Sequence, residues 1–509
     1  MTGALLVAGT ASDAGKSVVT AGICRWLARR GVRVAPFKAQ NMALNSVVTA
    51  TGAEIGRAQA MQAAAAGVEP EAAMNPVLLK PSGERHSQVV LMGRPHADVD
   101  ARSYQALKPA LQAPVLAALD DLRARFDVVV CEGAGSPAEI NLREHDLANM
   151  GLARAAGLPT VVVGDIDRGG VLAALYGTLA LLDAADQALI AGFIVNKFRG
   201  DPAILAPGLD RLRALTGRPT LGVLPWRRGL WLDVEDSLAL EAPREEAPAP
   251  LGPDGLDIAV VRLRWMSNFT DLDALAAEPG VSVRFTRSPV DIERAVLVVL
   301  PGTKATVRDL ARLRDAGLDR ALAARARRGD PLLAICGGYQ MLGRRIVDDV
   351  ESGEGEIAAL GLLPVETVFA REKTLGRVTG AAPWLDGGAP ATGFEIRHGQ
   401  VRRDGGEPLF TEREDGCRSG AVLGTSWHGV LEGDAFRRAL LAWVAAARGR
   451  RWTPGREPFA AVRERRLDAL GDLVEEHVDG DALLRLIEEG APPGLPLIPT
   501  NEAIACSSS

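Results

Sequence analysis

Five short apolar runs recur through the first 225 residues, and amphipathic segments separate them. Each run is rich in Val, Ile or Leu and ends in Gly, Pro or a polar residue; the runs are ALLVAG, FDVVVCEG, LPTVVVGD, ALIAGFIVN and PTLGVLP. A short run without polar alternation is typical of a strand buried on both faces. Strands that alternate with helices predict a parallel sheet covered by helices, so we expect an open α/β domain.

A second series of the same kind begins after residue 255, with LDIAVVRL, AVLVVLPG, DPLLAICGG and AVLGTSWHG. Between the two series, EAPREEAPAPLGPDG replaces the apolar pattern with proline, glycine and charge, which is typical of a linker. A chain of 509 residues is also too long for a single hydrophobic core. We therefore expect two open, mostly parallel α/β domains at residues 1–238 and 256–445, a linker at 239–255 and a C-terminal extension at 446–509, helical at first and ending in a loose tail.

The charge and the cysteines limit the classes of partner. A net charge of -6 argues against binding to nucleic acid or to an anionic membrane, both of which require a basic surface. Five cysteines form no CxxC pair, which favours a reducing compartment over a disulfide framework. The chain opens without a signal peptide and has no apolar run of membrane-spanning length. These features predict a soluble cytoplasmic protein and leave open whether it forms a homo-oligomer.

The turn between the first apolar run and the following helical pattern has the composition of a P-loop. A P-loop needs a strand, a glycine-rich turn whose N–H groups face phosphate, and a helix N-terminus. Here Lys16 is placed to reach the outer phosphates of a nucleotide and Ser17 to ligate Mg²⁺. The predicted nucleotide contacts from this turn are Gly9, Thr10, Asp13, Ala14, Gly15, Lys16 and Ser17. The alternative is a plain strand–turn–helix whose lysine faces solvent, and the ordered strand, glycines, Lys-Ser and helix argue against it.

Acidic residues follow two of the predicted strands. Glu132 stands at the carboxyl end of one strand, where open α/β sheets bind ligands, and a carboxylate there suits a Mg²⁺ site. Asp165 and Asp167 stand at the end of another, where a supporting role and a solvated loop position are equally good interpretations.

Five residues separate Gly9 from Gly15, one more than in the common P-loop. This longer turn resembles that of dethiobiotin synthetase and its relatives, which phosphorylate a carboxylate with ATP. The resemblance implies ATP and Mg²⁺ as cofactors and assigns Asn196 to the adenine.

A second chemical motif is LLAICGGYQMLG, in which Cys336 stands between a predicted buried strand and a predicted helix. A sharp turn there would expose the cysteine, and the helix N-terminus would favour its thiolate. Burial as a small apolar side chain is the alternative, but packing alone does not require both Gly337 and Gly338. The matching base is His428, which is set at another predicted strand end.

These residues resemble a triad-type, class I-like glutamine amidotransferase, although Ala334 replaces the first glycine of the G-x-C-x-G pattern. The resemblance implies that Cys336 attacks the glutamine side-chain amide while His428 moves the proton. The N–H groups of Gly302 and Gly337 are the expected oxyanion hole. Most such enzymes carry Glu two residues after the histidine, but position 430 is Val. Either His428 lacks an acidic partner, or Glu395 serves as one.

The two motifs together suggest ATP-dependent amidation of a carboxylate with glutamine as the nitrogen source. The full set of motifs resembles the cobyric acid synthase family over about residues 1–445; it comprises FKAQNMALNS, NPVLLKP, EGAGSPAEINL, DIDRGG, NKFRGD, LPGTKAT, ICGGYQML, GFEIRHG and WHG. That family amidates the b, d, e and g carboxylates of adenosylcobyrinic acid a,c-diamide, so the resemblance implies a corrinoid, glutamine and ATP as small-molecule partners.

Three other functions remain as alternatives. Cobyrinic acid a,c-diamide synthase shares both domains but tends to carry an Asp where this chain has Lys38 and Asn41, which leaves no third Mg²⁺ ligand to assign. A P-loop nucleotide switch would not need the cysteine motif. An amidotransferase relative that only hydrolyses glutamine would not need the Gly-Lys-Ser turn. Lys38, Asn41, Lys80 and Arg168 are candidate substrate contacts. Solvated surface charge is at least as good an interpretation of the three cations, and spacing alone does not define a corrinoid pocket.

Overall fold

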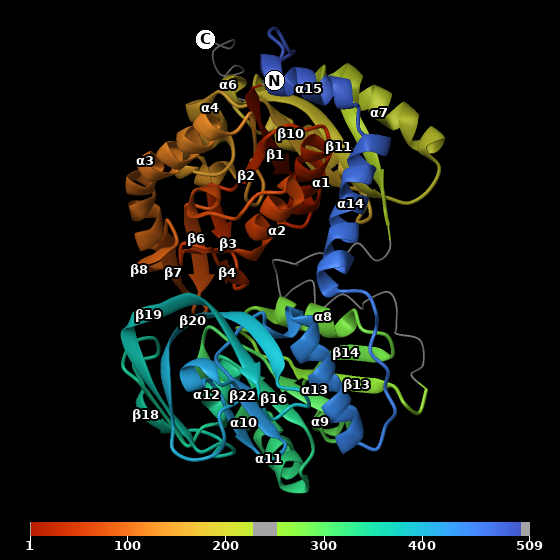
Figure 1. Cartoon of the computed structure of the whole chain (residues 1–509). Helices are drawn as coiled ribbons and strands as arrows, with labels where there is room; N and C mark the ends of the chain where they lie inside the picture. The colour runs from red at the N-terminus through yellow and green to blue at the C-terminus, as the bar shows by residue number, and fades with distance from the viewer. Residues whose placement is uncertain (1, 228–251, 500–509) are drawn as a thin grey trace.

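The computed structural model describes residues 2–227 and 252–499. Figure 1 shows two bodies stacked on one another, an N-terminal half (residues 2–227) above a C-terminal half (residues 252–447). Each half is built around a six-stranded sheet, which confirms the predicted class of two open, mostly parallel α/β units. Most of the predicted linker, residues 239–251, lies outside the described residues.

The large sheet of the N-terminal half is wholly parallel. Its strands, in sheet order, are β12 (Thr220–Pro225), β11 (Ile190–Phe198), β10 (Thr160–Asp165), β1 (Gly3–Gly9), β9 (Val128–Glu132) and β2 (Val34–Phe37). The five apolar runs form five of these strands, because a strand covered on both faces needs apolar residues at every position.

Helices cover both faces of this sheet. One face carries α3 (Ala101–Arg125), α4 (Met150–Ala156), α5 (Val171–Ala180) and α7 (Pro202–Thr216), with the short α6 (Ala184–Gln187), η1 (Ala72–Met74) and η2 (Ile140–His145) in the connections. The other face carries α1 (Lys16–Arg29), α2 (Arg57–Ala66), α14 (Phe459–His477) and α15 (Gly480–Glu489).

The large sheet of the C-terminal half is parallel except for one edge strand. Its order is β14 (Val281–Thr286), β13 (Leu256–Val261), β15 (Leu297–Leu300), β16 (Leu332–Ile335), β22 (Val422–Thr425) and the antiparallel β21 (Cys417–Ser419). The helices α8 (Asp273–Ala276) and α13 (Asp434–Ala447) cover one face. The helices α9 (Pro289–Arg294), α10 (Thr306–Asp315), α11 (Leu318–Arg328) and α12 (Gly337–Leu342) cover the other. Three short 3₁₀ segments complete it: η4 (Phe269–Leu272), η5 (Glu412–Glu414) and η6 (Val430–Glu432).

Smaller sheets, which the apolar pattern did not predict, lie where the two halves meet (Figure 1). The N-terminal half contributes β3 (Gln40–Met42), β6 (Val77–Pro81), β7 (His86–Leu91) and β8 (Arg94–Asp100), and the pair β4 (Ser46–Val48) and β5 (Glu54–Gly56). The C-terminal half contributes β17 (Arg345–Asp348), β18 (Gly355–Ala358), β19 (Val365–Ala382) and β20 (Ala389–Arg403). The segment NPVLLKPSGERHSQ, which has no clear period, supplies β6 and the first half of β7.

The C-terminal extension returns to the N-terminal half. Helix α14 packs along α1, and α15 packs against β1. Arg25 of α1 binds Asp468 of α14 with a nitrogen–oxygen distance of 2.7 Å. The prediction of a loose tail is wrong up to Ile498, whose backbone exchanges hydrogen bonds of 2.8 and 3.0 Å with the side chain of Gln187. The rest of the predicted tail, residues 500–509, lies outside the described residues. Within the described ranges, no helix combines the length and apolar character needed to cross a bilayer.

Candidate functional site

The phosphate turn connects β1 to α1. Gly15 has a φ of 97°, and a Cβ there would lie 2.0 Å from Nδ2 of Asn196, so only glycine fits. Lys16 begins α1 and curls back over the turn, donating to the carbonyl oxygens of Ala11 at 2.8 Å and Gly135 at 3.0 Å. A lysine held across a glycine-rich turn at a helix N-terminus has the geometry of a phosphate-binding site.

The residues predicted to bind nucleotide fall on this turn or beside it. Thr10 continues β1 by donating its backbone N–H to Val163 of β10 at 2.9 Å. Asn196 lies at the back of the turn, where its amide donates to the Ala14 carbonyl at 3.0 Å. Asp13 forms an ion pair with Arg168. The structure therefore gives Asn196 a contact with the turn itself, while its predicted adenine contact stays a prediction.

Glu132 meets Ser17 beneath the turn, as the predicted metal site requires. The Ser17 hydroxyl donates to Oε1 of Glu132 at 2.8 Å, and Lys38 binds the same oxygen at 2.9 Å. Gln62 donates to the other oxygen at 2.5 Å. Burial alone would raise the pKa of Glu132, but Lys38 and these hydrogen bonds together lower it, so the carboxylate is charged.

These donors fit a Mg²⁺ ion bound mainly through phosphate. Ser17 and Glu132 offer one hydroxyl and one carboxylate, and Mg²⁺ commonly takes few protein ligands beside substrate phosphates. Oε1 of Gln62 is buried and has no hydrogen-bond partner among the described residues, so a polar atom at this site is left unsatisfied. No cluster of three or more His, Cys, Asp or Glu side chains suited to a metal occurs in the described ranges.

The other acidic and amide candidates of this half contact protein groups. Asp165 binds Lys197 at 2.6 Å, and Asp167 binds Arg199 at 2.9 Å. Lys197 also donates to the carbonyl oxygen of Asp13 at 2.8 Å, which joins this pair to the phosphate turn. Asn41 donates to the Gln59 side chain at 2.8 Å inside the protein. Asp165 is thus linked to the turn through Lys197, whereas the supporting role of Asp167 stays a prediction.

Cys336 occupies a strained turn between β16 and α12. Its φ of 49° and ψ of -110° are rarely adopted by a residue with a side chain. A Cβ on Gly338 would lie 2.2 Å from the Leu300 carbonyl oxygen, and one on Gly337 would lie 2.8 Å from Cγ2 of Thr303. The two glycines let the loop after β15 pack tightly against the turn, which brings the Gly302–Thr303 backbone beside Gly337, where an oxyanion hole was predicted.

His428 reaches the same place from the end of β22, which pairs with β16. Its Nδ1 lies 2.7 Å from Oδ2 of Asp271 in η4, and Oδ1 of Asp271 accepts the Gly429 N–H at 2.8 Å. Asp271 was not predicted as a site residue, because it lies 157 positions from His428 in the chain and no local motif marks it. The two alternatives drawn from sequence, no acidic partner or Glu395, are therefore wrong. Glu395 instead binds Arg397 at 2.8 Å.

The charges around His428 favour its protonated form. Burial opposes that charge, but Asp271 and Cys336 outweigh it and raise the pKa of His428 to about 10. The ring stacks on Phe394 with 5.8 Å between centroids, and a Cβ on Gly302 would lie 2.7 Å from its Cε1. The imidazole is thus held by Asp271 at Nδ1 and packed against Phe394 and Gly302.

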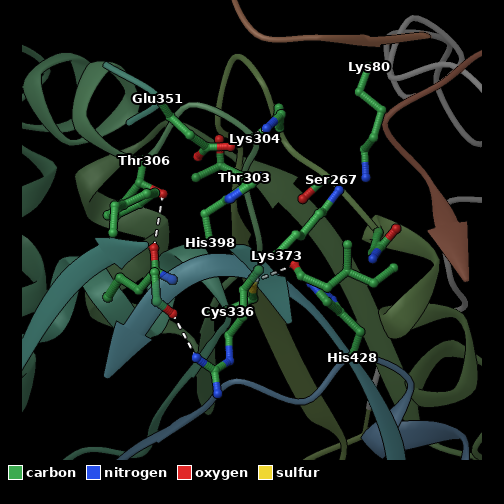
Figure 2. Close-up of a pocket in the computed structure, with 16 residues that line it drawn as sticks. Lys80, Ser267, Thr303, Lys304, Thr306, Cys336, Glu351, Lys373, His398 and His428 are labelled. Carbon is green, nitrogen blue, oxygen red and sulfur yellow. Dashed lines mark hydrogen bonds and ion pairs between the residues drawn. The ribbon is translucent and has the colours of Figure 1, made fainter. Parts of the chain in front are cut away.

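A pocket joins Cys336 and His428 to charged residues at the boundary of the two halves (Figure 2). It is lined by Lys80, Ser267, Asn268, Thr303, Lys304, Thr306, Cys336, Gln340, Glu351, Phe369, Lys373, Ile396, Arg397, His398, Gly399 and His428. Cationic and anionic side chains both occur in this lining, which suits a small zwitterion such as an amino acid. The chemistry available at its base is nucleophilic attack by a cysteine with a histidine as proton carrier.

Two family models match the chain. The model for a CobQ/CobB/MinD/ParA nucleotide binding domain matches residues 5–238, and that for a CobB/CobQ-like glutamine amidotransferase domain matches residues 257–436. Relatives that match almost the whole chain are named cobyric acid synthase. That of Frankia casuarinae is 63% identical, covering 98% of this chain and 99% of the relative. Those of Streptomyces avermitilis and Streptomyces coelicolor are 61% and 60% identical with the same coverage.

Proposed function

The chain belongs to the cobyric acid synthase family, and we propose that it converts adenosylcobyrinic acid a,c-diamide to adenosylcobyric acid by amidating the b, d, e and g carboxylates. As a member of that family it is a glutamine-hydrolysing ligase of cobalamin biosynthesis with a nucleotide-binding domain. In the proposal, residues 1–238 form the synthetase and residues 256–445 form the glutaminase. Helices α14 and α15 of the extension 446–509 buttress the synthetase.

The synthetase step activates the substrate carboxylate. A carboxylate oxygen attacks the γ-phosphorus of ATP, a mixed anhydride forms, and ADP leaves. Lys16 is placed to hold the outer phosphates, and Ser17 and Glu132 to hold Mg²⁺. The bound ion supplies positive charge that stabilises the transferring phosphate. Lys38 binds the same oxygen of Glu132 as Ser17 does, and Gln62 binds the other oxygen, so the carboxylate is held in place before the nucleotide binds.

The glutaminase step releases ammonia. The Cys336 thiolate attacks the side-chain amide carbon of glutamine, and the oxyanion is stabilised by the N–H groups of Gly302 and Gly337. His428 gives its proton to the departing nitrogen as the C–N bond breaks and a thioester remains. Asp271 fixes the imidazole through Nδ1, so that its other nitrogen is available for the proton transfer. Water then hydrolyses the thioester to glutamate.

The amide forms when the ammonia lone pair attacks the mixed anhydride carbon. The bond to phosphate breaks, phosphate leaves, and the nitrogen loses one proton. The observation that carries this proposal is the presence in one chain of both the Ser17–Glu132 contact under a phosphate turn and the strained Cys336 turn beside His428 and Asp271. A nucleotide switch has no use for the second site, and a simple glutaminase has none for the first.

The test uses purified protein with ATP, Mg²⁺, glutamine and adenosylcobyrinic acid a,c-diamide, with products followed by mass spectrometry. A ladder of four successive amides with one ADP released per amide is the expected result. Amidation of cobyrinic acid instead would identify the a,c-diamide enzyme. ATP hydrolysis with neither corrinoid amidated would favour the nucleotide switch.

A further inference from the structure

The pocket that holds Cys336 is closed on one side by the N-terminal half. Lys80, on β6 of the N-terminal half, lines it together with Lys373, on β19 of the C-terminal half. Figure 2 shows Lys80 entering from a separate strand, on the far side of Lys373 from Cys336. The pocket therefore runs from the glutaminase residues towards the synthetase half.

Glu54 joins these two lysines across the boundary. Its Oε1 lies 2.5 Å from Nζ of Lys80, and its Oε2 lies 2.5 Å from Nζ of Lys373. All three side chains are at most 4% exposed. Ser46 adds a hydroxyl bonded to both Glu54 and Lys80 at 2.8 Å. We call Glu54, Lys80, Lys373 and Ser46 the bridge cluster. One carboxylate oxygen of Glu54 binds a lysine of the N-terminal half, and the other binds a lysine of the C-terminal half.

Polar contacts seal the boundary around the bridge cluster. The Ser46 N–H donates to Oδ1 of Asn268 at 2.7 Å, and Asn268 itself lines the pocket. The Phe269 N–H donates to Oδ1 of Asn45 at 3.2 Å. On the other side Lys373 donates to Gln88 at 3.3 Å. These bonds tie the loop that carries Asp271 to the synthetase half. Protein groups, rather than solvent, therefore form the pocket wall that faces the synthetase half.

Burial at this end of the pocket favours neutral ammonia over ammonium. Lys304 is the third lysine of the pocket and pairs with Glu351. Burial lowers the pKa of Lys373 to about 8, with Lys80 and Lys304 adding to the effect and Glu54 opposing it. His398, which also lines the pocket, has its pKa lowered mainly by burial, so it adds no positive charge at neutral pH. Burial that disfavours the positive charge of Lys373 also disfavours an ammonium ion beside it, and only unprotonated ammonia is a nucleophile.

The strand that carries Lys80 leads to the phosphate site. β6 pairs with β3, with Leu78 opposite Asn41, and β3 begins two residues after Lys38. The Lys38 N–H donates to the Met74 carbonyl at 2.9 Å, just before β6. Since Lys38 binds Glu132, one small sheet connects the bridge cluster to the carboxylate that the proposal assigns to Mg²⁺.

We propose that ammonia released at Cys336 leaves the pocket between Lys80 and Lys373 into the synthetase half, and that Glu54 is the positioning residue that keeps this exit closed to bulk water. The inference rests on the proposed function for the fate of the ammonia. The nitrogen leaves glutamine as NH₃ with the proton from His428, crosses without a change in bonding, and forms its new bond only at the mixed anhydride.

The first test is the yield of amide per glutamine hydrolysed in full-length Glu54→Gln. Assays contain glutamine labelled with ¹⁵N in the amide and an excess of unlabelled ammonium. Wild type should form close to one amide per glutamate and keep the label in the corrinoid. Glu54→Gln should still release glutamate, yet give several-fold fewer amides per glutamate and a diluted label. An unchanged ratio and label would overturn the inference.

Two matched variants separate this effect from general loosening. Glu69→Gln removes another contact between the halves, the exposed 3.2 Å pair with Arg377, and should leave the ratio unchanged. Lys373→Gln removes the partner of Glu54 in the C-terminal half, and it leaves Glu54 paired with Lys80, whereas Glu54→Gln leaves two buried lysines unpaired. If Glu54→Gln folds poorly, Lys373→Gln should still show the lower yield of amide per glutamate. A wild-type yield of amide per glutamate in Lys373→Gln would count against the proposed ammonia exit between Lys80 and Lys373.

The second test needs neither ATP nor a corrinoid. The rate at which iodoacetamide alkylates Cys336, read from its own peptide by mass spectrometry, should rise several-fold in Glu54→Gln and stay at the wild-type value in Glu69→Gln. An equal rate in all three proteins would contradict a closed exit. The alkylation rate does not depend on corrinoid amidation. If the wild-type protein amidated no corrinoid, that result would count against the proposed function, and the alkylation rates would still decide the role of Glu54.

Discussion

Asp271 accepts the Nδ1 proton of His428 at 2.7 Å, although 157 positions separate the two residues in the chain. Asp271 also accepts the N–H of Gly429, so one carboxylate fixes both the ring and the backbone beside it. Its own loop is tied to the synthetase half through the Asn45–Phe269 and Ser46–Asn268 hydrogen bonds. The geometry of the glutaminase base thus depends on a segment that contacts the other half.

Asp271→Asn should lower glutamine-dependent turnover by about 100-fold or more, because a misoriented imidazole loses its role as proton carrier. Synthesis with ammonium salts should continue at the wild-type rate. The comparison variant is Glu395→Gln, whose carboxylate binds Arg397 in the pocket wall and should change KM for glutamine rather than kcat. Equal kcat losses in both variants, from steady-state glutamate release, would contradict the assignment of Asp271.

Cys336→Ala should abolish glutamine-dependent amidation and keep ammonium-dependent amidation, since only the ammonia source is lost. Residual use of glutamine by this variant, measured as glutamate release, would exclude Cys336 as the nucleophile.

The strain at Cys336 predicts a stability difference between two inactive variants. Glycine accepts a φ of 49° without cost, so Cys336→Gly should be more stable than Cys336→Ala by about 1 kcal/mol. Urea unfolding of the two variants measures this difference. Equal free energies of unfolding would mean that the turn relaxes when the sulfur is removed.

Lys16→Ala should remove amide synthesis with either nitrogen donor, because the phosphates of ATP lose their cation. Glutamate release should survive, since Cys336 and His428 are in the other half. Both rates are measured on the same preparation. Ammonium-dependent synthesis at the wild-type rate would exclude Lys16 from phosphate binding.

The raised pKa of His428 predicts how stability changes with pH. Asp271 and Cys336 raise it from 6.5 to about 10 against the effect of burial, so the native state holds this proton more tightly than the unfolded chain. The resulting stabilisation is fully present below about pH 6.5 and is lost as pH rises through about 10. The excess free energy of unfolding of wild type over Asp271→Asn should therefore shrink between these limits in urea titrations. A constant difference across that range would contradict the shifted pKa.

The sequence by itself determined the two large sheets and the local chemistry at each. Buried strands such as Val128–Glu132 are apolar at every position before the last, so their pattern is visible without any partner. The phosphate turn and the cysteine turn are also local, since each needs a strand, glycines and a helix within about a dozen residues. Ser17 and Glu132 were predicted as a pair because both follow strands of one parallel sheet, whose carboxyl ends meet at one edge.

The tertiary structure decided what depends on contacts between distant segments. Asp271 is one acidic residue among many until η4 folds against the end of β22. No motif marks Glu54 or Lys373, and Lys80 was only a candidate substrate contact. The docking of the small sheets is what buries the three side chains together. The extension is similar, because α14 has a partner only once α1 is in place. Local periodicity records which face of a segment is buried, but it carries no information about which distant segment buries it.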